Sequence, residues 1–124
     1  MNVKFFRCAE GGNLVELIEN GGGKLVCCGQ PMKELIPGTT DAAVEKHVPA
    51  VKREGNTIHV QVGSVAHPMT EAHLIQWIEA VQDGKIQRVT LTASDAPTAT
   101  FQVEDGPVDV YEYCNLHGLW KAEA

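Results

Sequence analysis

The chain has 124 residues, and its 16 acidic and 10 basic side chains give a formal net charge of −6. This length suits one ordinary domain or two small ones, and 44% hydrophobic with 21% charged residues is typical of a globular protein. The negative charge argues against a general nucleic-acid binder, because such proteins need clustered cations to replace phosphate counterions. No apolar run reaches the roughly 18–20 residues of a membrane helix, so we expect no membrane association.

The expected compartment decides how the cysteines are interpreted. The first residues lack the apolar stretch and the cleavage site of a secretory signal, so we expect a cytoplasmic protein. In a reducing cytoplasm, four cysteines are more often metal ligands or free thiols than disulfides.

The first 36 residues differ from the rest, because they hold three of the four cysteines and six of the twelve glycines. Residues 14–18 predict a strand, residues 20–23 (Asn-Gly-Gly-Gly) a turn, and residues 24–27 the returning strand of a hairpin. A segment this short usually needs a metal, disulfides or a partner to fold. With residues 37–40 read as a linker, we expect a small domain over 1–36 and a larger one over 37–124.

Beyond residue 41 the pattern is mainly β. Residues 57–62 (Thr-Ile-His-Val-Gln-Val) alternate with period two, as in a half-buried strand. Further strand candidates are residues 89–92, 100–103 and 108–113, with turn signals between them. Short strands at this spacing favour a small antiparallel sandwich.

One segment is ambiguous. Its apolar residues recur with helical spacing, between a possible cap at Thr70 and a possible end at Gly84. These residues are Leu74, Ile75, Trp77, Ile78 and Val81. Their period alone predicts a helix.

Histidine and cysteine side chains are the candidates for chemistry. Cys114 and His117 form a C-x-x-H pair after a predicted strand, and His47, His67 and His73 precede it. His59 is set aside, because it falls on the polar face of an alternating strand. Any single histidine is more often an ordinary surface or core residue, and spacing alone does not show that these residues meet. If they do, one thiolate and four imidazoles exceed the four ligands of structural zinc and favour iron.

These residues resemble a known family, the superoxide reductases. The resemblance rests on residues 45–49 (Glu-Lys-His-Val-Pro), on the pair His67 and His73, and on residues 114–120 (Cys-Asn-Leu-His-Gly-Leu-Trp). Cys8 and residues 27–32 (Cys-Cys-Gly-Gln-Pro-Met) are similar to the desulforedoxin-like domain of the two-domain members, the desulfoferrodoxins. The resemblance covers essentially the whole chain.

The resemblance implies a mainly β fold: a carboxy-terminal immunoglobulin-like seven-stranded β-sandwich after a small amino-terminal desulforedoxin-like domain. The segment after His73 is then a strand, against its helical period, with Trp77 and Ile78 in the core. The resemblance also implies one mononuclear non-haem iron per chain, with four equatorial histidines and an axial cysteine. The implied ligands are His47, His67, His73, His117 and Cys114.

The activity that the resemblance implies is the one-electron reduction of superoxide to hydrogen peroxide, with electrons from a rubredoxin-like donor. The resemblance also implies a homodimer. Glu45 is expected to occupy the sixth iron position in the resting state, and Lys46 to attract superoxide and guide a proton through a bound water. Glu45 and Lys46 could also be an ordinary solvated charge pair on the surface. Their position beside His47 favours a role in the reaction. In the same way, the backbone N–H groups of Leu116 and His117 are expected to bind the cysteine sulfur.

Two other hypotheses stay open. A non-catalytic iron electron-transfer or metal-binding module would share these ligands. A structural immunoglobulin-like interaction domain with incidental histidines would bind no iron at all.

The amino-terminal site departs from the family pattern. Cys8, Cys27 and Cys28 match three of its four cysteines, but Gly11 stands at the fourth position. Because three thiolates do not complete a tetrahedral tetra-cysteine site, we expect the second, rubredoxin-like iron to be absent. The alternatives are a three-cysteine site closed by water, zinc in place of iron, or a disulfide between Cys8 and one of the other two.

Overall fold

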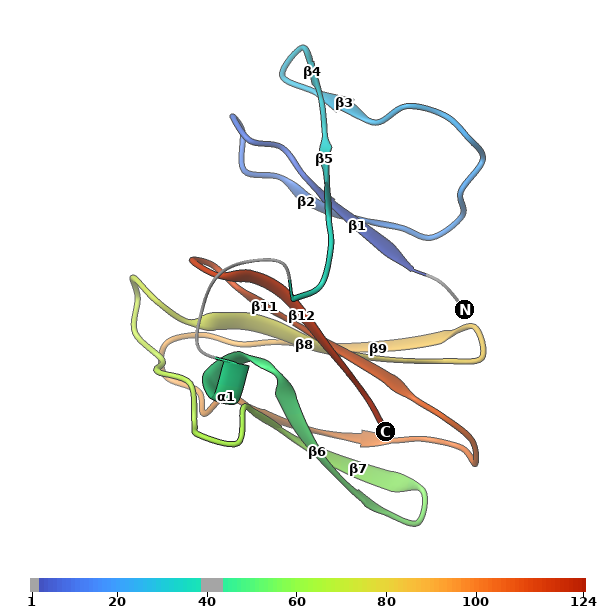
Figure 1. The fold of residues 1–124 in the computed structure, drawn as a ribbon, viewed down its shortest axis with the longest axis vertical. Helices are drawn as coiled ribbons and strands as arrows, with labels where there is room; N and C mark the ends of the chain where they lie inside the picture. Colours follow the sequence, from blue (N-terminus) through green and yellow to red (C-terminus); the bar gives the residue numbers. More distant parts are fainter. Residues whose placement is uncertain (1–2, 39–43) are drawn as a thin grey trace. The chain divides into compact units, whose positions relative to one another are not determined.

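The computed structural model of this protein describes residues 3–38 and 44–124 (Figure 1). Within them, one compact unit ends at Ile36 and the other begins at Pro37. Residues 39 and 40 of the expected linker lie outside the described residues. Strands dominate both units, which confirms the expectation of a mainly β protein. In the described part of the chain, no helix combines the length and the apolar character that a membrane crossing needs.

The amino-terminal unit is built around β1 (Lys4–Arg7), which pairs antiparallel with β2 (Leu14–Leu17) on one side and β5 (Lys33–Leu35) on the other. A separate two-stranded ladder joins β3 (Val26–Cys27) to β4 (Gln30–Pro31). Cys8, just after β1, and the pair Cys27 and Cys28, at the end of β3, therefore belong to the same small unit.

The hairpin predicted between residues 14–18 and 24–27 is wrong, because β2 pairs with β1 instead. Pairing with β1 gives β2 a four-residue ladder next to the buried ring of Phe5, whereas β3 has only two residues to pair. The glycine-rich segment turns locally: the N–H of Gly22 donates to Asn20 Oδ1 at 3.0 Å, and Gly22 has a φ of +84°. The glycines thus form a loop rather than a two-residue hairpin turn.

The carboxy-terminal unit is a sandwich of two antiparallel sheets, with seven strands in residues 44–124 (Figure 1). The strand orders are β10–β7–β6 and β12–β11–β8–β9. A short helix, α1 (Val44–His47), leads into the first sheet. The strands are β6 (Pro49–Glu54), β7 (Thr57–Val62), β8 (Ile75–Gln82), β9 (Lys85–Thr90), β10 (Thr98–Gln102), β11 (Asp109–Cys114) and β12 (Gly118–Glu123). The expected seven-stranded sandwich is confirmed.

The core lies between the two sheets and follows the predicted alternation. Ile58, Val60 and Val62 of β7 are buried, whereas His59 and Gln61 between them are exposed. The second sheet contributes buried residues of β8 and β11, among them Ile78, Ala80, Val110 and Cys114. The core therefore extends to Cys114, at the end of β11.

β8 confirms the strand that the family resemblance implied. Seven of its eight residues are buried, and Gln76 is the exception. Ile78 belongs to the core between the sheets, while Trp77 is buried on the opposite face and stacks on Tyr113 with ring centroids 6.0 Å apart. A strand buried on both faces loses its alternation, which explains why its apolar residues imitate a helical stripe.

Candidate metal centre

Five side chains from three distant segments converge at one end of the sandwich. Their potential ligand atoms all lie within 4.8 Å of one another. His47 is the last residue of α1, His67 and His73 lie on the connection between β7 and β8, and Cys114 and His117 flank the turn between β11 and β12. The fold thus brings together the five residues that sequence spacing could not join.

The four imidazoles form a closed ring. Successive ring centroids are 4.8 Å apart for His47 and His67, 4.6 Å for His67 and His73, 5.0 Å for His73 and His117, and 4.8 Å for His117 and His47. Each neighbouring pair meets edge to face, with interplanar angles between 77° and 89°. The sulfur of Cys114 lies 3.4 Å from His67 Nε2 and 3.9 Å from His117 Nδ1. The four rings therefore form a closed four-sided arrangement, and the cysteine sulfur lies beside two of them.

The ring nitrogens are oriented as metal donors. His67 Nδ1 donates to the carbonyl of Pro68 at 2.7 Å, which leaves the Nε2 lone pair for the centre. His117 Nδ1 and His47 Nε2 are 3.1 Å apart, close to the spacing of about 3 Å for two nitrogens bound at right angles about 2.1 Å from one ion. His73 Nε2 is buried and has no hydrogen-bond partner among the described residues. A buried, unpartnered nitrogen in this ring fits a metal ion.

The protonation states also suit a metal. Burial, assisted by the neighbouring histidines, lowers the pKa of His67 to about 4, and burial likewise lowers the pKa of His73. Both rings are therefore neutral near pH 7 and keep a lone pair for coordination. Burial raises the pKa of the Cys114 thiol, whereas hydrogen bonds from the backbone of Leu116 and His117 lower it. Those two N–H groups therefore favour the thiolate, as expected from the sequence.

Comparison with known proteins assigns the chain. The desulfoferrodoxin family model matches residues 39–123, and the model of the desulfoferrodoxin N-terminal domain matches residues 2–35. The chain belongs to the desulfoferrodoxin family. The family and the donor set agree on a mononuclear non-haem iron centre with four histidines and one cysteine.

Two relatives and one solved structure illustrate the assignment. Desulfoferrodoxin of Nitratidesulfovibrio vulgaris is 52% identical over 121 residues, with 98% of this chain and 96% of that protein covered. Desulfoferrodoxin of Syntrophotalea carbinolica is 51% identical with the same coverage. The crystal structure of the superoxide reductase from Treponema pallidum superposes with a TM-score of 0.78 at 37% identity, covering 98% of this chain and 99% of that one.

Lys46 is placed near the centre. It is exposed on α1, directly before His47, and its positive charge contributes to the lowered pKa of His73. Glu45 precedes it on α1, but the side chain of Glu45 lies outside what the structure describes. Of the two expected accessory residues, the structure thus places one cation close enough to act on the ring electrostatically.

Two residues that support the centre were missed as functional residues in the sequence. Trp120 stacks on His47 with ring centroids 5.1 Å apart, and its Nε1 donates to the carbonyl of His117 at 3.0 Å. Asn115 accepts from the N–H of Leu74 at 3.0 Å and donates to the carbonyl of Ala72 at 2.9 Å. Asn115 therefore fastens the His73 segment to the Cys114–His117 turn. Neither role has a local sequence signal, because both depend on tertiary contacts.

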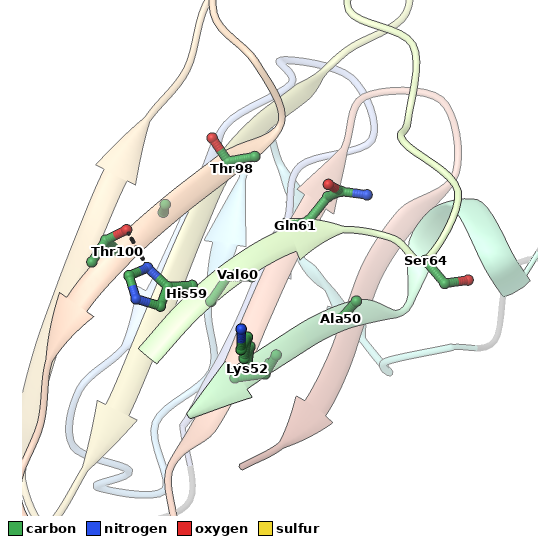
Figure 2. Close-up of a pocket in the computed structure, with 10 residues that line it drawn as sticks. Ala50, Lys52, His59, Val60, Gln61, Ser64, Thr98 and Thr100 are labelled. Carbon is green, nitrogen blue, oxygen red and sulfur yellow. Dashed lines mark hydrogen bonds between the residues drawn. The ribbon is translucent and has the colours of Figure 1, made fainter. Parts of the chain in front are cut away.

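His59 lies outside the ring, as expected. It is exposed on the outer face of the three-stranded sheet, with Nδ1 3.2 Å from Thr100 Oγ1 (Figure 2). This face is hollowed by a cavity of about 460 Å³ that Lys52, Gln61 and Thr98 help to line. None of the five converging residues lines it, so we assign it no part in the metal centre.

A second cluster lies in the amino-terminal unit. The sulfurs of Cys8, Cys27 and Cys28 are also within 4.8 Å of one another. Hydrogen bonds from Cys27 and from the N–H of Gly11 lower the pKa of Cys8 to about 7. The three cysteines therefore form a potential metal site by geometry. The expected absence of a rubredoxin-like iron from this unit stays a prediction.

Proposed function

We propose that this member of the desulfoferrodoxin family is a superoxide reductase. In the reaction, one superoxide takes up one electron from a reduced donor and two protons, and one hydrogen peroxide leaves. The observation that carries the proposal is the ring of four imidazoles with a buried cysteine sulfur at its side. The likeness to a structure described as a superoxide reductase supports it.

The charge of the donor set suits an anionic substrate. Four neutral imidazoles and one thiolate supply a single negative charge, so a ferrous ion held there keeps a net charge of +1. When bound, the iron supplies the electron and a sixth coordination position. Cys114 is fully buried, whereas His73 and His117 are partly exposed. Superoxide would therefore approach from the side opposite the sulfur.

Residues of the chain itself then guide the substrate and the proton. The exposed ammonium of Lys46 raises the local concentration of anions, although the whole protein is negative. Lys46 also orients a water that delivers a proton to the reacting oxygen. The N–H groups of Leu116 and His117 restrain the electron donation of the sulfur. In the oxidised resting state, the carboxylate of Glu45 would fill the sixth position.

The partners follow from the same chemistry. A single iron exchanges electrons one at a time, which suits a one-electron donor of the rubredoxin type. We include a homodimeric assembly and a cytoplasmic location in the proposal, on the family resemblance. The free thiols of the structure fit a reducing compartment.

The test measures stoichiometry and rate together. The ferrous protein is mixed with pulses of superoxide, and iron oxidation and hydrogen peroxide are followed. We expect one peroxide per superoxide consumed, with one iron oxidised, at a rate that falls as salt is added. One peroxide per two superoxides would indicate dismutation instead. Slow oxidation that is indifferent to salt would indicate the non-catalytic electron-transfer module.

A further inference from the structure

The amino-terminal cluster has the geometry of a three-ligand metal site. The sulfurs of Cys27 and Cys28 are 3.9 Å apart, and Cys8 lies within 4.8 Å of both. A tetrahedral ion with metal–sulfur bonds of about 2.3 Å separates its sulfurs by about 3.8 Å. The thiols are free in the structure rather than joined as disulfides. Three sulfurs therefore already stand near the corners of one tetrahedron.

Gly11 occupies the remaining corner. A Cβ atom built on Gly11 would lie 3.1 Å from the sulfur of Cys28, 3.4 Å from that of Cys8 and 4.0 Å from that of Cys27. A side chain at this position would thus point at all three sulfurs, but glycine supplies no donor atom. The iron tetrathiolate of the family does not fit this chain, because its fourth ligand is missing.

We propose that Cys8, Cys27 and Cys28 bind a zinc-type divalent cation whose fourth coordination position, above Gly11, is open to an exogenous small ligand. A d¹⁰ ion suits this site, because it binds thiolates without a redox change and accepts three protein ligands with a fourth from solvent. The exposure of Cys28 lets a water, an imidazole or a small thiol reach that position.

The surroundings of the cluster support a bound ion. Three thiolates and a divalent cation carry one negative charge, which two donors offset: the N–H of Gly11 lies 3.2 Å from the sulfur of Cys8, and Asn13 Nδ2 lies 3.8 Å from that of Cys27. The unit has only about 35 residues and short strands. Domains below about 40 residues usually need such a cross-link to fold.

The experiment uses the full chain with iron already bound at the histidine–cysteine centre. Cobalt is added as a spectroscopic probe for zinc, and native mass spectrometry counts the ions bound per chain. We expect one additional ion per chain, with the absorption of a tetrahedral cobalt thiolate. Imidazole added afterwards is expected to shift the cobalt bands, because it enters the open position.

Two variants serve as controls. Gly11→Cys closes the site, so its cobalt bands should no longer respond to imidazole, and with iron it should give a rubredoxin-like spectrum that the parent chain lacks. The backbone of Gly11 is not in the left-handed region, so its conformation permits a cysteine. The Cys28 sulfur, 3.1 Å from the added Cβ, would shift by a few tenths of an ångström to make room. Cys28→Ser removes one thiolate and should weaken binding of the additional ion by about 100-fold, because losing even a residue that only supports a ligand costs about 10–100-fold.

Three results would overturn the proposal. The first is that the reduced parent chain binds no additional ion while its three thiols all react with a thiol reagent. The second is a loss of two mass units from a disulfide that persists with zinc and a reductant present. The third is bound cobalt whose bands ignore imidazole in the parent chain as they do in Gly11→Cys, because the fourth position would then be closed.

Discussion

The indole of Trp120 stacks on the imidazole of His47, with the two ring planes inclined by 28°. The same indole donates its N–H to the carbonyl of His117. One side chain on β12 therefore fixes two members of the histidine ring that are 70 residues apart in the sequence. Contacts of this kind orient metal ligands without touching the metal.

Replacing Trp120 should weaken metal binding in two steps. Trp120→Phe keeps an aromatic ring against His47 but loses the hydrogen bond, and Trp120→Leu loses both. We expect iron affinity to fall by about 10-fold to 100-fold in the leucine variant and less in the phenylalanine variant, as measured by competition with a chelator. Trp77→Phe is the control, since Trp77 stacks on Tyr113 instead. Equal losses for Trp77→Phe and Trp120→Phe would contradict a specific role of Trp120.

Asn115→Ala should loosen the connection that carries His73. The substitution leaves the N–H of Leu74 and the carbonyl of Ala72 without their side-chain partner. We expect the free energy of unfolding to fall by about 1–3 kcal/mol in urea titrations, and metal affinity to fall with it. Gln61→Ala removes a comparable side-chain bond to the carbonyl of Gly63, and it should leave metal affinity unchanged. The same loss of affinity in both variants would refute the fastening role.

Lys46→Ala should slow the reaction with superoxide by about tenfold at low salt and flatten its salt dependence, because the steering charge is removed. Lys52→Ala changes the net charge equally but on the outer face of β6, so it controls for global charge. Oxidation by dioxygen, which is neutral, should be equal in both variants. Equal salt slopes for Lys46→Ala and the parent protein would exclude steering by Lys46.

The buried side chain of Glu112 should make the protein less stable as the pH rises. It is fully buried on β11, both carboxylate oxygens lack a hydrogen-bond partner among the described residues, and burial raises its pKa well above the ordinary value. The unfolded chain therefore releases this proton first as the pH rises. Between the unfolded pKa of about 4.3 and the raised folded pKa, this group lowers stability by about 1.4 kcal/mol per pH unit.

The matching measurement compares unfolding of the metal-free protein at several pH values. Glu112→Gln cannot ionise, so it should resemble the parent near pH 4 and become more stable than the parent as the pH rises. Glu19→Gln, at an exposed glutamate, should follow the parent throughout. Parallel curves for Glu112→Gln and the parent would show that Glu112 does not titrate as proposed.

Local pattern was a good guide where one face of a strand meets solvent. The alternation of residues 57–62 predicted β7 with its bounds, and the exposure of His59 followed from it. The pattern misled at β8, where both faces are covered, and only the resemblance to a known family indicated a strand. It also misled in the amino-terminal unit, where β1 outcompetes residues 24–27 as the partner of β2.

The metal centre was also only partly predictable from the local sequence. The residue types indicated a metal, but the ring joins segments as far apart as His47 and His117, and such closure is a tertiary property. The five candidates could be listed from the sequence, but only the family resemblance joined them into one ligand set. The contacts of Asn115 with Ala72 and Leu74 were beyond sequence reasoning, because they depend on how two loops meet.

The five donors also divide between the two layers of the sandwich. His47 leads directly into β6 of one sheet, whereas Cys114 and His117 belong to the hairpin of the other. An ion held by all five donors cross-links the two sheets at this end of the β-sandwich. Removing the ion loosens that end first. The rate at which proteases cut the loops there therefore reports what fraction of the protein holds its metal ion.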